Sequence, residues 1–258
     1  MQVLRLIKAD FMKLKHTPFY WIHIFVPISV VTAFLLYYSY SKINSISKLN
    51  GFFEAISIAF PLIIGVICAL VMEQEKKAGK FKEMISTENS RGICLFSKLM
   101  VMIICGAISL IITVSGFYIG FQYFLKQNMF SINLYINIAV VVFIAQLSLY
   151  LFHVFLSIRF GSGVSIGMGI FESMISGLFI TGLGDGIWRY VPCSFAVRFS
   201  DGFFVKEAGT ADVFNTLAGT GYWIKQCAAG FINCIIITFV GVIALKMWFD
   251  YFEFSNCE

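Results

Sequence analysis

Long uninterrupted runs of apolar residues, separated by short polar stretches, dominate this chain of 258 residues. About 20 consecutive apolar residues in a helix are needed to cross the hydrocarbon core of a bilayer. Each run is continuously apolar rather than alternating, which favours helices over the strands of a membrane barrel. The pattern therefore predicts an all-α membrane protein with six transmembrane helices, at 19–40, 52–72, 99–125, 132–158, 164–183 and 227–249.

The first 17 residues follow a different pattern from the apolar runs. Leu4, Ile7 and Phe11 recur at helical spacing, while basic residues such as Lys8 lie elsewhere on the helical wheel. This spacing predicts an amphipathic interfacial helix over residues 1–17, on the inner membrane surface. The alternative is an ordinary basic flank that only enforces membrane orientation.

The composition agrees with this pattern. Apolar residues make up 59% of the chain and charged residues only 13%. Soluble domains carry about 25% charged residues, so lipid must be the solvent for most of this surface. No repeat, low-complexity segment or soluble domain interrupts the sequence, which predicts a single transmembrane domain over 1–258.

One stretch outside the apolar runs, 184–226, is unusually long and rich in aromatic residues such as Trp188, Tyr190 and Phe199. Tryptophan and tyrosine favour the interface between membrane and water. Long structureless loops are also uncommon in compact domains. We therefore expect this outer segment to dip back into the membrane or to pack on the bundle as short helices.

Basic residues are distributed unequally between the two sides of the predicted bundle. If the N-terminus is cytoplasmic, the short outer segments hold Lys42, Lys48 and Lys126. The inner side then holds Arg5, Lys8, Lys13, Lys15, Lys76, Lys77, Lys80, Lys82, Arg91, Lys98, Arg159 and Lys246. Short cytoplasmic segments carry the excess of Lys and Arg in membrane proteins. The sequence therefore predicts a multi-pass protein of the cell membrane with both termini in the cytoplasm.

The segment between the second and third runs, 73–92, is strongly charged and carries Phe81, Met84 and Ile85 on one side. This spacing predicts a short amphipathic helix at the inner membrane surface. The alternative is a solvated connector that is merely rich in charge.

Glu172 lies near the middle of the fifth apolar run, where an ionised carboxylate costs about 3 kcal/mol or more. One helix face there, by steps of three and four, holds Ser162, Ser165, Gly169, Glu172 and Ser176. We expect this face to point into the bundle or towards a wet path rather than towards lipid. Glu172 is then a contact for a cationic substrate, a switch in a transport cycle, or a protonated group that hydrogen-bonds neighbouring helices.

Two motifs overlap at the start of the same run. Gly163 and Gly167 form a G-x-x-x-G pair that predicts the close approach of another helix. With Ser165 between them they also match G-x-S-x-G, a nucleophile motif that requires a strand-to-helix turn and here opens a membrane helix. The link at 159–163 is short enough to bring His153 close to Ser165. An intramembrane serine hydrolase is therefore a rival interpretation.

Several signatures are missing from the sequence. No G-x-x-x-x-G-K-[ST] loop occurs, so the chain has no nucleotide-binding site of that kind. No H-E-x-x-H motif, dinucleotide fingerprint or C-x-x-C pair is present, and no metal site or nucleic-acid partner is indicated. The apolar runs lack repeated charged residues, which argues against an ion-driven transporter. Cys193 and Cys227 could both lie outside and form a disulfide.

The 73–98 region resembles that of the ABC-2 type permeases. In that family an acidic residue closes the second span, and a glycine, an aliphatic stretch ending near a threonine, a Ser-Arg pair and a lysine follow. The matching positions here are Glu75, Gly79, Met84, Ile85, Thr87, Ser90, Arg91 and Lys98. The chain departs from the commonest form by having Lys80 where threonine is usual and by lacking proline after Thr87.

Within that group the chain is most similar to the lantibiotic-immunity permeases of Gram-positive bacteria, over nearly its full length. The similarity rests on chain length, six apolar runs, the K-L-K-H-T stretch at 13–17 and the outer string from Trp188 to Arg198. Cys193 and Phe195 depart from the tryptophan and tyrosine that are common in that string.

The resemblance implies an ABC-2 permease fold of the type V exporter kind, and a transport subunit rather than an enzyme. It implies two copies of a cytoplasmic ABC ATPase, which bind the ATP and magnesium, and a second, distinct permease subunit. The segment that docks the ATPase would contain Glu73, Glu75, Lys76, Lys77, Gly79, Phe81, Met84 and Ile85. The substrate path would contain Glu172, Ser165, Ser176, Asp185, Trp188 and Arg198. The expected substrate is a lantibiotic or similar antimicrobial peptide in the membrane lipid, and the alternative is a drug, lipid or polysaccharide.

Overall fold

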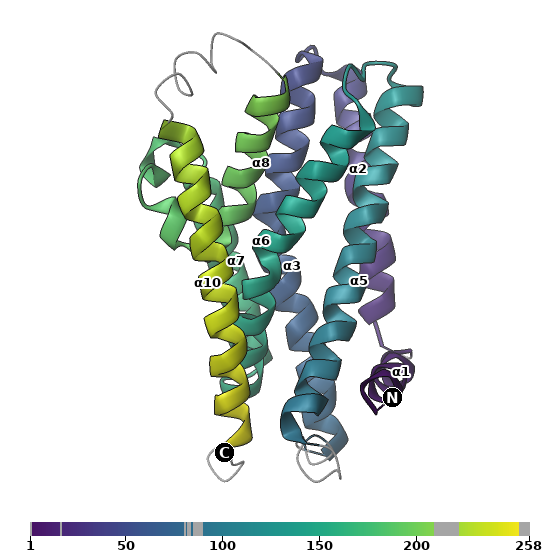
Figure 1. The fold of residues 1–258 in the computed structure, drawn as a ribbon. Helices are drawn as coiled ribbons and strands as arrows, with labels where there is room; N and C mark the ends of the chain where they lie inside the picture. The colour runs from purple at the N-terminus through teal and green to yellow at the C-terminus, as the bar shows by residue number, and fades with distance from the viewer. Residues whose placement is uncertain are drawn as a thin grey trace.

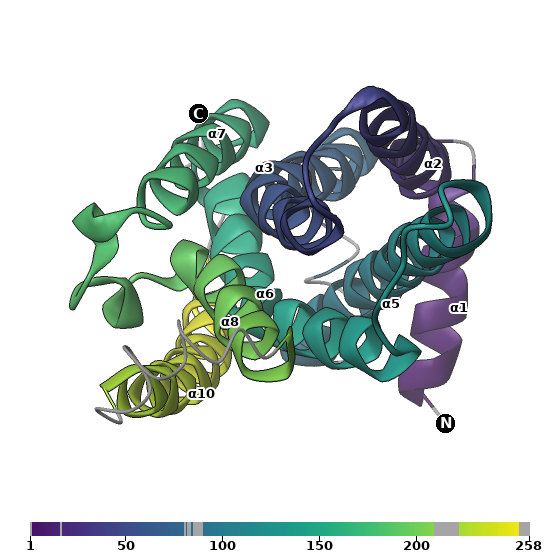
Figure 2. The same ribbon diagram turned by 90° about the horizontal axis from the view of Figure 1, so that it is seen from above.

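The computed structural model describes residues 2–15, 17–79, 81, 84, 90–208 and 222–252, and within these residues it contains helices and no strand. Long helices run side by side in a bundle, and a short N-terminal helix lies at one end (Figures 1 and 2). The helices are α1 (Gln2–Leu14), α2 (Phe19–Tyr40), α3 (Ser45–Gly79), α5 (Arg91–Ile119), α6 (Ile132–Arg159), α7 (Ser162–Leu178), α8 (Pro192–Ala208) and α10 (Tyr222–Asp250).

Five helical segments of the described chain are long and apolar enough to cross a membrane, which makes this a multi-pass membrane protein. They are α2, α3, α5 with the π-helical turn Gly120–Phe124 that extends it, α6 and α10. The predicted span at 164–183 is not among them, because α7 ends at Leu178 after 17 residues. Two 3₁₀ turns, Gly182–Gly184 and Trp188–Tyr190, follow in place of a sixth long helix.

The N-terminal segment is helical from Gln2 to Leu14. Seen from the side, α1 is viewed nearly along its axis while the long helices stand upright, and from above it lies lengthwise (Figures 1 and 2). It therefore runs across the bundle axis, the direction that suits a helix on a membrane surface. The end of α3, the start of α5 and the end of α10 lie at the same end of the bundle as α1 (Figure 1).

Proline interrupts the hydrogen-bond ladder of α3 without ending the helix. Pro61 has no N–H to donate to the Ser57 carbonyl, which instead faces Gln146 Nε2 of α6 at 3.4 Å. The next backbone N–H, that of Leu62, donates to Ser173 Oγ of α7 at 3.2 Å. Side chains of neighbouring helices thus satisfy the freed backbone groups, as a proline inside a membrane helix requires.

The described parts of the aromatic 184–226 segment, 184–208 and 222–226, lie against other helices of the chain. Helix α8 forms its middle part and lies against α3 and α6. Trp188 is almost fully buried, and Phe199 stacks on Phe231 of α10 with ring centroids 4.0 Å apart. Cys193 and Cys227 are both free thiols, so the suggested disulfide between them is wrong.

Candidate functional site

A buried ionic cluster joins three helices at the α1 end of the bundle. Lys98 Nζ of α5 lies 2.8 Å from Asp10 Oδ1 of α1 and 2.6 Å from Glu75 Oε1 of α3. The Ser97 hydroxyl donates to the other oxygen of Asp10, and Lys13 Nζ lies 3.8 Å from Glu75 Oε1. Two carboxylates are therefore balanced by one buried and one half-exposed ammonium group. Breaking such a pair leaves an uncompensated buried charge, so this cluster fixes α1 to the long helices.

Asp10 is not one of the residues that the sequence patterns above single out, although the sequence contains a signal for it. It lies four residues after Leu6 and four before Leu14, on the apolar side of an otherwise basic helix. Leu14 is buried and Leu6 packs against the core, so Asp10 points the same way. An acid on the apolar side of a basic helix indicates a buried cation as its partner.

Some of the predicted coupling residues are exposed in the structure and others are buried. Lys76 and Lys77 are exposed at the end of α3, and Lys77 pairs with Glu73 at 3.5 Å. Phe81 and Met84, in contrast, are buried in the chain's own core. The surface that this part of the described chain offers to another subunit is therefore basic.

The remaining coupling candidates have different surroundings. Gly79 ends α3 with φ +151°, a conformation that favours glycine because it has no Cβ. Phe81, two residues later, has φ 63°, which is uncommon for a residue with a side chain. Together they turn the chain sharply at the end of α3. Ile85 lies outside the described residues.

A second buried network lies among α3, α6 and α7. His153 Nδ1 is 3.0 Å from Ser165 Oγ, and His153 Nε2 is 2.9 Å from Glu172 Oε2. Ser165 Oγ also donates to the Gly65 carbonyl of α3 at 3.1 Å. The residues that α7 buries are Ser165, Gly169, Glu172 and Ser176, so this part of the predicted face points into the bundle, while Ser162 is partly exposed.

The direction of these hydrogen bonds argues against a nucleophilic serine. The single hydroxyl proton of Ser165 is donated to Gly65, so Ser165 must accept from His153 Nδ1–H. A nucleophile activated by a general base has to donate its proton to that base instead. His153 then shares one proton with Glu172 through Nε2, and the pair is neutral whichever partner holds it.

The close approach of α3 and α7 depends on glycines other than the predicted pair. A Cβ added to Gly65 would lie 2.8 Å from the Ser165 carbonyl oxygen, and one added to Gly169 would lie 2.9 Å from the Pro61 carbonyl oxygen. A Cβ at Gly163 or Gly167 would meet nothing within 4 Å among the described residues. The predicted packing role of the 163/167 pair is therefore wrong within this chain.

A cavity of about 610 Å³ opens beside Glu172, between α6, α7, α10 and the start of α8. Phe152, Phe155, Phe171 and Trp248 contribute aromatic walls. Glu172 is the one carboxylate that lines it in the described part of the chain. The cavity thus offers an apolar surface with a single site that can attract a cation.

The other predicted path residues lie around this cavity rather than in it. Arg198 Nη2 bonds Asp185 Oδ1 at 2.9 Å and the Thr181 carbonyl at 2.8 Å, which folds the 179–191 turns against α8. Trp188 packs edge-on against Phe199. Ser176 is fully buried one turn beyond Glu172. None of these residues is among those that line the cavity.

A family model described as "ABC-2 family transporter protein" matches residues 6–176, which is more than half of the chain. The match runs from within α1 nearly to the end of α7 and includes both buried networks. No curated protein and no solved structure matches the chain. On the family match the chain belongs to the ABC-2 family of transporter proteins, as the membrane-spanning permease component of an ABC transporter.

Proposed function

We propose that this permease exports a membrane-active cationic peptide of the lantibiotic type and so protects the cell that carries it. The observation that supports this substrate class is the cavity beside Glu172, with its aromatic walls and its one carboxylate. Peptides of this class combine apolar rings with basic groups. The aromatic walls suit the rings, and the Glu172 carboxylate suits a basic group. The resemblance of the full chain to immunity permeases points the same way.

The size of the cavity limits what it can hold at one time. Its volume of about 610 Å³ lies within the range of roughly 300–1,000 Å³ typical of small-molecule pockets. It therefore accommodates one part of a peptide, such as a ring with an adjacent basic side chain.

The energy for export would come from a separate ATPase, two copies of which dock at the α1 end of the bundle and bind ATP and magnesium. In this arrangement that end and both termini face the cytoplasm, and a second permease subunit completes the transporter. We propose that α7 and α8 together provide the sixth crossing. A push on the end of α3 would reach α1 and α5 directly, because Lys98 of α5 pairs with both Glu75 of α3 and Asp10 of α1.

Charge reversal at Lys76 tests where the ATPase docks. We expect Lys76→Glu to weaken co-purification with the ATPase roughly tenfold, because a like charge opposite an acidic patch costs about 1.4 kcal/mol or more. The matched control is Lys42→Glu, an equally exposed lysine at the other end of the bundle, which should leave the association unchanged. Equal losses in the two variants would place the docking surface elsewhere. Aspartate at Phe81 or Met84 is a poor test, because both side chains are buried in the permease itself.

Replacing Glu172 with glutamine tests the substrate class. Glutamine keeps the shape and a hydrogen bond to His153 but removes the charge, so cells with Glu172→Gln should tolerate about tenfold less of a cationic peptide. Acetylation of the peptide's amines should lower export by the wild-type permease to the level of the variant. The control is Ser176→Ala, on the same face one turn away, which should keep full resistance.

Two outcomes of that comparison contradict the proposal. If Glu172→Gln leaves resistance and substrate-stimulated ATPase activity unchanged, the carboxylate only joins helices. If the variant loses resistance to the acetylated and the cationic peptide equally, the cavity does not select for charge, and a neutral drug or lipid becomes the better substrate.

A further inference from the structure

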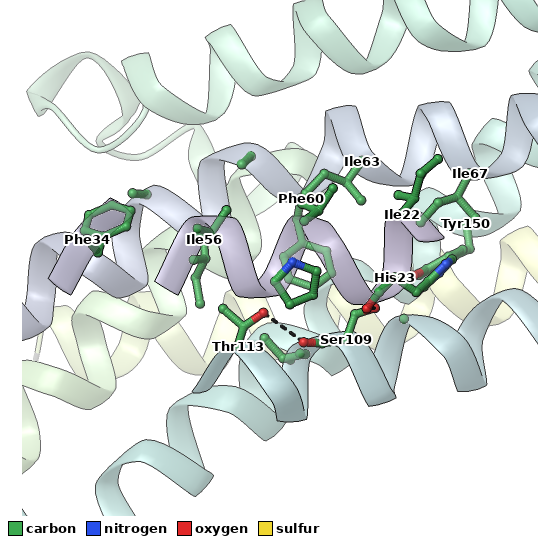
Figure 3. Close-up of a pocket in the computed structure, with 17 residues that line it drawn as sticks. Ile22, His23, Phe34, Ile56, Phe60, Ile63, Ile67, Ser109, Thr113 and Tyr150 are labelled. Carbon is green, nitrogen blue, oxygen red and sulfur yellow. Dashed lines mark hydrogen bonds between the residues drawn. The ribbon is translucent and has the colours of Figure 1, made fainter. Parts of the chain in front are cut away.

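A second cavity, separate from the one beside Glu172, lies between α2, α3, α5 and α6 (Figure 3). Its volume is about 150 Å³, and most of its walls are aliphatic or aromatic side chains. In Figure 3, Phe34 and Ile56 lie towards one end, while His23, Ser109 and Tyr150 lie together towards the other. The cavity is therefore apolar along most of its length and polar at one end.

Two polar atoms at that end lack a partner in the described part of the chain. They are His23 Nε2 and the Tyr150 hydroxyl oxygen. The side chain of His23 is only 5% exposed and that of Tyr150 is fully buried. Buried polar groups in folded proteins are nearly always hydrogen-bonded, so each unpaired atom needs an explanation. Both residues line this cavity, which makes an occupant of the cavity the natural partner.

The chemistry of the two atoms is complementary. His23 Nδ1 lies 2.7 Å from the Phe19 carbonyl, which can only accept, so Nδ1 carries the proton. In the neutral imidazole Nε2 is then a free acceptor, whereas the Tyr150 hydroxyl can donate. A single hydroxyl group could donate to His23 and accept from Tyr150 at once. An ammonium group could not accept, and a carboxylate could not donate.

Gly106 of α5 leaves room for the Tyr150 hydroxyl group at the polar end of the cavity. A Cβ added to Gly106 would overlap the Tyr150 hydroxyl group. Ser109, one turn along α5, donates to the His23 carbonyl at 2.9 Å and holds α2 beside α5. The polar end is thus shaped by three helices.

We propose that this cavity binds a small neutral alcohol, with its hydroxyl between His23 and Tyr150 and its apolar body directed towards Phe34 and Ile56. Water alone would pair the two polar atoms but would leave the apolar part empty, because apolar cavities of roughly 150 Å³ stay dry and admit benzene-sized molecules. An amphiphile of that size satisfies both parts. The site is independent of the exported substrate and of Glu172.

Photolabelling of the purified transporter tests this proposal. The probe is an aliphatic alcohol that carries a diazirine, compared with its deoxy analogue. We expect saturable labelling of peptides from α2 and α3 that line the cavity, displaced by benzyl alcohol and not by toluene. Tyr150→Phe removes only the hydroxyl and should raise the half-saturating concentration of the alcohol about tenfold, with no change for the deoxy analogue.

Two further variants keep the test decisive. Tyr135→Phe, also buried in α6 but away from this cavity, should label as wild type. Ala59→Leu fills part of the cavity and should abolish the site-specific labelling. Equal labelling by the alcohol and its deoxy analogue would overturn the proposal, as would labelling that Tyr150→Phe leaves unchanged. Absence of saturable labelling would mean that the cavity holds water only, which also overturns it.

Discussion

Replacing Lys98 with methionine is expected to lower the thermal midpoint of the detergent-solubilised permease by roughly 10 °C. Methionine fills a similar space but leaves the Asp10 and Glu75 carboxylates facing each other with no buried cation between them. Removing one partner of a buried ion pair costs about 3–5 kcal/mol of unfolding free energy. For a chain of this length each kcal/mol corresponds to a shift of about 2–4 °C. The measurement is the fraction of monodisperse protein that remains after heating to a series of temperatures.

The cause of this loss can be separated from a simple packing defect. Lys98→Arg keeps the charge and should retain most of the stability. Adding Asp10→Asn and Glu75→Gln to Lys98→Met removes the uncompensated charges, so the triple variant should recover a large part of the midpoint. If the triple variant were as unstable as Lys98→Met alone, the ionic network would not be the source of the stability.

A single methyl group at Gly169 is expected to have the second large effect. Gly169→Ala places its Cβ 2.9 Å from the Pro61 carbonyl oxygen and 3.0 Å from Leu62 Cα, backbone atoms that cannot turn aside. Helix α7 must then move away from α3, and such overpacking costs about 1–3 kcal/mol. The expected result is a midpoint lower by several degrees. Export should fall with it, because the displacement carries Glu172 away from His153.

The matched control is Gly167→Ala in the same helix. Both changes bring the same gain in helix propensity, so the difference between them reports the contact with α3. Gly167 is exposed and its added Cβ meets nothing within 4 Å in the described chain. A destabilisation of Gly167→Ala equal to that of Gly169→Ala would contradict the close approach and would indicate a contact from another subunit at Gly167.

Much of the fold follows from the sequence, because a helix that crosses lipid needs only a continuous apolar run of sufficient length. Five of the six predicted apolar runs are long helices, and α2 and α3 continue through Pro27 and Pro61. The run at 164–183 differs because hydropathy does not report where a helix ends. Helix α7 ends at Leu178, and the rest of the run forms a 3₁₀ turn at Gly182–Gly184.

The sequence predicts those residues of the candidate site that lie on one face of one helix, and it does not predict which residues of other helices they contact. The spacing of Ser165 and Glu172 placed both side chains in the bundle, and their shared partner His153 depended on the short α6–α7 link. The apolar residues Phe81 and Met84 were expected to face a partner, yet the chain buries them itself. Periodicity identifies an apolar face without naming what covers it. The Asp10–Lys98 pair joins residues 88 positions apart, which no local pattern reveals.

Helix α3 has 35 residues, so it is about 50 Å long, well beyond the roughly 30 Å of hydrocarbon that it crosses. Its middle is held against α7 at Gly65, and its ends are held by lysines, Lys48 through the Tyr38 carbonyl and Lys98 through Glu75. A helix that is held near its centre can pivot there as a lever. A sideways displacement of its end on one side of the membrane would then move the other end in the opposite direction, without any rearrangement of side chains between them.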